Sequence, residues 1–269
     1  MFAQTSVQID NDSQLPEANP ARPSVSNPAH IPPVGYLQFE QGILQANGSP
    51  ELDRQFSVNQ VVKLSVNSRL MLQFATQPVA FSRLAEVHGR DTGDLQIGAQ
   101  AIVSKGAGLA PTVALGYLRR VRSGSAPDLD IGAFSQSGLL LMSGDLGQFH
   151  YDANLVISEQ VANGIRRAQY GQALSITHDI FTPRLELTGE LWHFTQPFAT
   201  AARAVGMLWA VGYSARPNLV FDAGFDHGLT GTSTHWQSFA GCTYLLPRRL
   251  WKRRAPRQAS KQHGHRHRR

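Results

Sequence analysis

Apolar and polar residues alternate along most of the chain between Val34 and Leu246. In the segment from Gln55 to Val66, apolar residues share one parity, while Gln, Ser, Asn and Lys occupy the other. A period of two is that of a β-strand with one apolar and one polar face. The pattern predicts about twelve strands, which begin near Val34, Gln55, Arg69, Gly93, Leu109, Ala133, Gln148, Ala168, Arg184, Arg203, Pro217 and Thr234.

The connections between these segments fall into two alternating classes. Tight turns are expected at Asn67-Ser68, 105–108, 143–147, 178–183 and 214–217, with longer polar loops between them. Segments of about ten residues match a tilted strand that crosses a bilayer, and this alternation of turns and loops is typical of bacterial outer-membrane barrels. The pattern therefore predicts an all-β fold, a transmembrane antiparallel β-barrel over residues 34–246.

A soluble β-sandwich or barrel is also built from short alternating strands. In such a fold the polar parity should be rich in Lys and Glu, but here it is mostly Gln, Asn, Ser and Thr. Low charge combined with an apolar exterior favours lipid. Aromatic residues near strand ends on the apolar parity are expected either in interfacial girdles or in a generic core: Tyr117, Phe149, Tyr213, Trp236 and Tyr244.

The two ends of the chain differ in composition from the barrel. Residues 1–33, rich in Pro, Asn, Gln and Ser, predict a flexible arm, and residues 247–269 predict a disordered basic tail rich in His and Arg. Ten of the 25 Lys and Arg residues follow Pro247, which leaves 15 Lys and Arg against 19 Asp and Glu, a net charge of −4. That balance excludes a basic nucleic-acid-binding surface on the barrel.

The chain starts without a basic segment followed by an apolar stretch, so a signal peptide for export is expected upstream of Met1. Localisation in the bacterial outer membrane is expected. The loop from Gln77 to His88 carries Phe81, Leu84 and Val87 at roughly helical spacing and predicts a short helical turn folded into the barrel mouth.

Several short motifs resemble one family of outer-membrane proteins. Residues 91–98 (DTGDLQIG) are similar to its glycine-rich strand opening, with Asp91 in place of the first Gly, and residues 138–154 resemble its central hairpin. Gly189-Glu190-Leu191 and residues 219–228 resemble later strands. The family is that of the MetA-like transporters, which are associated with the meta-cleavage pathway of phenol degradation. The resemblance implies a twelve-stranded outer-membrane barrel with a transport role, and it carries over no catalytic or substrate-binding residues.

Motifs for catalysis, for a cofactor or for a metal are not found in the sequence. It contains no GxSxG, HExxH, GxxxxGK or strand-linked GxGxxG pattern, so no enzyme, cofactor or metal ion is predicted. His150 and His235 fall on the polar parity without a serine or acidic partner at a recognisable spacing. A lipid-acting outer-membrane enzyme that uses these histidines, and a closed structural or adhesive barrel, are the two alternatives.

The ionisable residues on the polar parity are the predicted lining of the lumen. They are Glu40, Lys63, Arg69, Asp94, His150, Asp152, Arg184, Glu186, Glu190, Asp222 and Asp226. Their acidic excess should disfavour anions in an open channel. Alternatively, opposite charges on neighbouring strands pair and fill a narrow lumen, with Lys63 or Arg69 facing Glu40 or Asp94.

Together these features predict a passive channel or transporter for small solutes, with apolar or aromatic compounds among them. The expected partners are outer-membrane lipid, the solute and the barrel-assembly machinery, and nucleic acid is not expected. Arginines in or beside two of the longer loops are candidates to bind lipopolysaccharide phosphates: Arg119, Arg120, Arg122, Arg166 and Arg167.

Overall fold

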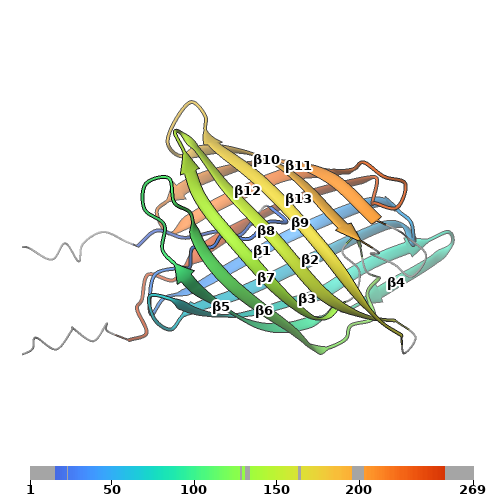
Figure 1. Cartoon of the computed structure of the whole chain (residues 1–269). Helices are drawn as coiled ribbons and strands as arrows, with labels where there is room; N and C mark the ends of the chain where they lie inside the picture. The colour runs from blue at the N-terminus through green and yellow to red at the C-terminus, as the bar shows by residue number, and fades with distance from the viewer. Residues whose placement is uncertain are drawn as a thin grey trace, which may run out of the picture.

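The computed structural model describes residues 16–22, 24–127, 129–130, 134–162, 165–195 and 203–251. All regular structure in these residues is β-strand (Figure 1). The strands are β1 Leu37–Ser49, β2 Leu52–Ser65, β3 Leu70–Leu84, β4 Val87–Asp91, β5 Leu95–Ser104, β6 Thr112–Arg122, β7 Phe134–Leu146, β8 Phe149–Ala162, β9 Ile165–Asp179, β10 Leu185–Thr195, β11 Arg203–Arg216, β12 Leu219–Gly228 and β13 Trp236–Leu245. No described helix is long and apolar enough to cross a bilayer.

The sheet closes on itself. Consecutive strands pair antiparallel, except that β5 pairs with β3 and not with β4. Strand β1 pairs with β13 in an unbroken register from Gln38↔Leu245 to Asn47↔Trp236. The short strand β4 pairs only with the outer part of β3, so the closed ring contains twelve strands. In a closed ring each of these strands has a hydrogen-bonded neighbour on both sides. Lipid requires this, because it offers no hydrogen-bond partners to backbone polar groups. The predicted fold class is therefore confirmed.

The outer surface of the ring is apolar and the inner surface is mainly polar. In β9, Leu174 and Ile176 are 47% and 48% exposed on the outside, whereas Ser175 between them is buried. Four of the aromatic residues expected in girdles, Tyr117, Phe149, Tyr213 and Trp236, are also exposed on the exterior. A water-soluble barrel would have the opposite polarity, because exposed apolar area of this extent is unfavourable in water.

Both ends of the ring-forming chain lie at the same end of the barrel as the five connections β2–β3, β5–β6, β7–β8, β9–β10 and β11–β12. We call it the turn end, and the opposite one the loop end. Between β2 and β3, the Asn67 side-chain oxygen accepts hydrogen bonds from the amides of Arg69 and Leu70, at 2.8 and 2.9 Å. This Asx turn reverses the chain locally. In outer-membrane barrels the end with the tight turns faces the periplasm.

Two expectations about the loop end need correction. The β1–β2 connection is only Pro50 and Glu51, because β2, β3 and β9 run to 14 or 15 residues instead of about ten. The segment from Gln77 to His88 is not a helical turn: β3 continues to Leu84 and forms a hairpin with β4 through Ala85, whose φ is +51°. Residues 1–15 of the predicted arm and 252–269 of the predicted tail lie outside the described residues.

The apolar exterior leads to a test of the lipid-facing side of the barrel. Leu191 is 61% exposed near the middle of β10, so Leu191→Arg places a charge near the centre of the bilayer. We expect it to lower the free energy of unfolding by about 2–4 kcal/mol. Leu146, 60% exposed at the turn end of β7, is the matched control, and Leu146→Arg should cost about 0–1 kcal/mol. Urea unfolding in lipid vesicles measures both, and equal losses would contradict the membrane orientation.

Candidate functional site

The N-terminal arm lies inside the barrel. It enters at the turn end, where the Ala18 amide donates to the Pro217 carbonyl at 2.8 Å, and Asn19 and Gln38 then exchange two hydrogen bonds at 2.8 and 2.6 Å. The sequence predicts a flexible segment here. Its described residues 16–22 and 24–33 are instead held by hydrogen bonds to the polar wall. The reason is that its backbone donors, which form no secondary structure of their own, find acceptors on the strands.

The middle of the arm is held by two buried carboxylates. Arg22 donates to Asp222 on β12 through Nε and Nη2, at 3.4 and 3.3 Å. Glu190 on β10 accepts the amide hydrogens of Val25 and Ser26, at 2.8 and 2.6 Å. Hydrogen bonds to charged acceptors are stronger than those between neutral groups. These two predicted lumen residues therefore act as anchors for the chain's own segment.

Beyond Ser26 the arm continues along the neighbouring strands β8 and β7. Asn27 and Asn154 on β8 exchange hydrogen bonds of 2.7 and 2.9 Å, and the Ala29 amide donates to the Ser143 hydroxyl on β7 at 2.7 Å. Ala29 also belongs to an apolar cluster with the inward-facing Ile102, Ala114 and Leu141, against which Ile31 and Leu139 pack. The wall thus has an apolar patch on its inner face, against which Ala29 and Ile31 pack.

Charge pairing occurs within the wall as well. Lys63 on β2 donates to Glu40 on β1 at 2.6 Å, with both side chains at least 95% buried. Asp94 pairs with Arg120 at 3.3 Å near the loop end. Arg69 departs from the prediction: it is exposed on the β2–β3 turn and donates to the Val103 carbonyl at 3.0 Å.

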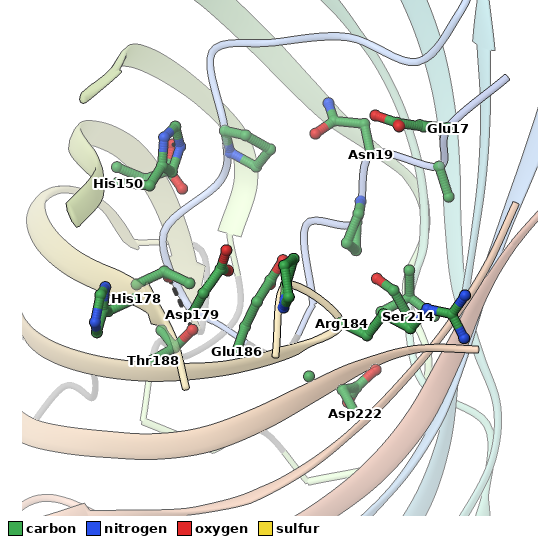
Figure 2. A pocket seen from close by; sticks show the side chains of 18 of the residues that line it. Glu17, Asn19, His150, His178, Asp179, Arg184, Glu186, Thr188, Ser214 and Asp222 are labelled. Atoms are coloured by element: carbon green, nitrogen blue, oxygen red, sulfur yellow. Dashed lines mark hydrogen bonds and ion pairs between the residues drawn. The ribbon is translucent and has the colours of Figure 1, made fainter. Parts of the chain in front are cut away.

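A cavity of about 840 Å³ lies between the arm and the wall at the turn end (Figure 2). We call it the turn-side cavity. Figure 2 shows Glu17 and Asn19 on the arm opposite His150, His178, Asp179, Glu186 and Asp222 on the strands. Carboxylates outnumber arginines among its charged lining residues, which are Glu17, Asp145, Asp152, Asp179, Glu186, Asp222, Arg22, Arg184 and Arg216. Five predicted lumen residues, His150, Asp152, Arg184, Glu186 and Asp222, meet here.

His150 has acidic partners that the sequence spacing did not reveal. Its Nδ1 lies 2.7 Å from Asp145 and its Nε2 lies 3.5 Å from Asp152, while the Ser143 hydroxyl contacts Asp152. A nucleophilic serine must hydrogen-bond to the histidine that takes its proton, but here the serine contacts the carboxylate and also accepts from the arm. His30 on the arm lies near His150, with ring centroids 6.3 Å apart and the rings tilted by 38°. Burial, followed by the neighbouring His150, lowers the pKa of His30.

A second cavity of about 250 Å³ lies on the other side of Arg22 and Val25, in the loop-end half of the barrel. We call it the loop-side cavity. The β6–β7 loop reaches into it: Asp130 accepts hydrogen bonds from the Thr234 amide and from the Gln237 side chain on β13, and burial raises the pKa of Asp130. Gln55 on β2 also donates to the Pro127 carbonyl of this loop, at 3.1 Å.

The apolar lining of the loop-side cavity is not among the residues predicted from the sequence. The signal was present, because these residues fall on the polar parity of their strands: Leu44, Trp192, Phe194, Leu208 and Phe239. Asp226, from the predicted list, lies among them and accepts a hydrogen bond from the Trp192 indole at 2.8 Å. Within the described residues, no group of three His, Cys, Asp or Glu side chains is arranged to hold a metal ion.

Comparison with solved structures identifies the fold. An outer membrane channel from Pseudomonas putida F1 superposes with a TM-score of 0.59 at 13% identity, over 81% of this chain and 98% of the channel. The chain has the fold of an outer-membrane channel. The NanC porin (TM-score 0.54, 9% identity, 78% of this chain and 100% of the porin) and the KdgM porin (0.52, 10%, 77% and 98%) share it, which agrees with the expected outer-membrane localisation. No known family matches the sequence, and no curated protein does.

The buried Lys63–Glu40 pair gives a test of how the wall is stabilised. Glu40→Gln or Lys63→Met alone leaves one charge buried without its partner, so each should lower the free energy of unfolding by about 3–5 kcal/mol. The double variant removes both charges and should lose clearly less than the sum. Denaturant unfolding in lipid vesicles measures the cycle.

The exposed pair between Arg166 and Glu159 is the control for that cycle. Their charged atoms are 2.6 Å apart, but the Arg166 side chain is 70% exposed, so Arg166→Met should change stability by at most about 1 kcal/mol. Additive losses from the two single variants would show that Glu40 and Lys63 do not act as a pair.

Proposed function

We propose that the chain forms a passive outer-membrane channel for small solutes, with its own N-terminal arm as the element that limits passage. The observation that carries this proposal is the position of the arm: its described residues cross the lumen, with a polar cavity on the turn side and a smaller one on the loop side. The interior of an eight-stranded barrel is just wide enough for side chains to fill, and a twelve-stranded barrel is wider. The arm occupies part of that space through hydrogen bonds, which can exchange with water.

The lining charges favour cations over anions in this proposal. Asp179 and Glu186 lie across the β9–β10 pairing in the turn-side cavity, and Asp222 is only partly offset by Arg22. An acidic lining at close quarters raises the local concentration of cations and repels anions.

The finer solute class comes from the resemblance to the MetA-like family. It supports small apolar or aromatic compounds as solutes, and the apolar side chains around the loop-side cavity are compatible with them. At the same end of the barrel, Arg119, Arg120 and Arg122 finish β6, and Arg166 and Arg167 begin β9. In our proposal these arginines bind lipopolysaccharide phosphates at the outer rim. Recognition by the barrel-assembly machinery stays a prediction.

Deleting the arm tests whether it limits passage. Removal of residues 1–33 takes away the segment that contacts Asp222, Glu190 and Asn154, and we expect a several-fold rise in single-channel conductance in planar bilayers. Deletion of residues 1–15 alone is the matched control and should leave the conductance near that of the full chain. A faster-migrating unboiled band on a gel checks that each protein forms a closed barrel.

The alternative of a closed structural barrel is favoured by the same contacts, because an arm bound by two buried carboxylates and an apolar cluster can be permanent. Conductance that stays at baseline after deletion of residues 1–33, in a protein that passes the gel test, would establish this alternative and reject the channel.

The acidic lining predicts measurable cation selectivity. In a KCl gradient, the channel should show a reversal potential of the sign expected for K⁺ over Cl⁻. The combined variant Asp179→Asn and Glu186→Gln should shift that potential toward zero, because both carboxylates line the turn-side cavity. Glu51→Gln, in the exposed β1–β2 connection, should not shift it. An unchanged reversal potential in the double variant would show that this cavity is not on the ion path.

A further inference from the structure

The loop-side cavity differs in chemistry from the rest of the lumen. Its walls are the rings of Trp192, Phe194 and Phe239 together with the aliphatic side chains of Leu44 and Leu208. Val25 on the arm and Leu129 on the β6–β7 loop complete the apolar lining. A space of about 250 Å³ is smaller than the sites that hold drug-sized ligands, and apolar walls with a few polar groups are typical of small-molecule sites.

Asp226 is a polar group in this cavity that can accept a further hydrogen bond. It is 5% exposed, and one carboxylate oxygen accepts the Trp192 indole hydrogen at 2.8 Å. The other oxygen, Oδ1, has no hydrogen-bond partner in the described part of the chain. Buried carboxylate oxygens are nearly always hydrogen-bonded, so an unpartnered one marks a place for a donor. The broad terminal torsion of Asp lets this oxygen turn with little cost.

The charges around the cavity favour a cationic donor. Asp130 and Asp226 both line it, and the one guanidinium among its described lining residues, that of Arg22, is engaged with Asp222 at 3.3 Å. A small cation would therefore offset carboxylate charge that no nearby described side chain neutralises. Trp and Phe rings also attract a cation that approaches their faces.

We propose that the loop-side cavity binds a small organic cation, a primary ammonium carried on an aromatic or branched apolar body. The ammonium donates to Asp226, and the apolar body packs against Trp192, Phe194 and Phe239. Asp130 on the β6–β7 loop adds a second carboxylate to the lining of the cavity. That such a cation is also a transported solute rests on the proposed channel function, whereas the binding itself does not.

Calorimetric titration of the full chain, refolded in detergent micelles, tests the site. The probe is 2-phenylethylammonium, compared with the neutral 2-phenylethanol and the anionic 3-phenylpropionate, each corrected with protein-free micelles. We expect the ammonium to bind at least about tenfold more tightly than the alcohol, because a charge-assisted hydrogen bond is worth that much or more. The anion should not bind measurably.

Two variants and a control locate the binding. Asp226→Asn keeps an acceptor for Trp192 but removes the charge, and it should weaken ammonium binding about ten- to hundredfold while leaving the alcohol nearly unchanged. Leu208→Trp fills the cavity and should abolish binding of both ligands. Asp179→Asn removes a carboxylate from the turn-side cavity instead and should have no effect. The gel shift on boiling confirms that each variant is folded.

The outcomes separate this inference from the channel proposal. Equal affinity for the ammonium and the alcohol, ammonium binding that is unaffected by Asp226→Asn, or no binding of the ammonium would each overturn the site. Binding as expected in a protein without conductance would reject the channel but keep the site, and conductance without binding would do the reverse.

Discussion

The pairing of β1 with β13 is the interaction on which the rest of the structure depends. It closes a twelve-stranded ring, and closure is what allows a sheet to cross lipid, since no backbone donor or acceptor is left at an edge. Once the ring is closed, the two parities of every strand have different surroundings. The apolar parity faces outward, as at Leu174 and Ile176, and the polar parity is enclosed in a narrow interior.

Enclosure creates a second requirement, because polar groups removed from bulk water need partners. Part of that requirement is met within the wall, where Lys63 and Glu40 pair. Much of the remainder is met by the arm, whose irregular backbone supplies amide hydrogens to Glu190 and whose Arg22 pairs with Asp222. The arm and the wall therefore satisfy each other's hydrogen-bonding groups. Burying the strand carboxylates without the arm, or the arm amides without the carboxylates, would cost free energy.

The barrel could be predicted from the sequence because its signal is local: alternation assigns each residue a face without knowledge of the other strands. The same argument placed Glu40, Glu190, Asp222 and Asp226 in the interior. It could not place the arm, because a segment without periodicity has no face, and its position depends on contacts with residues more than a hundred positions away. Nor could it give Asp145 as a partner of His150, because that contact comes from the β7–β8 register. Apolar residues on the polar parity, such as Leu141 and Phe239, were the available sign that the interior holds apolar contacts.

Passage through such a lumen depends on the strength of the arm's attachment. Each hydrogen bond to a charged group contributes about 1.5–3 kcal/mol net, and Arg22 and the amides of Val25 and Ser26 make several of them. Displacement of the arm requires these hydrogen bonds to break together, so it is rare. The full chain therefore passes only solutes that fit between the arm and the wall. The contacts are not uniform, however. The polar anchors near Arg22 can exchange with water, whereas Ala29 and Ile31 are held by apolar packing against Leu141. The anchors at Arg22, Val25 and Ser26 lie between the two cavities, so the passage from one cavity to the other widens only when these charge-assisted hydrogen bonds break.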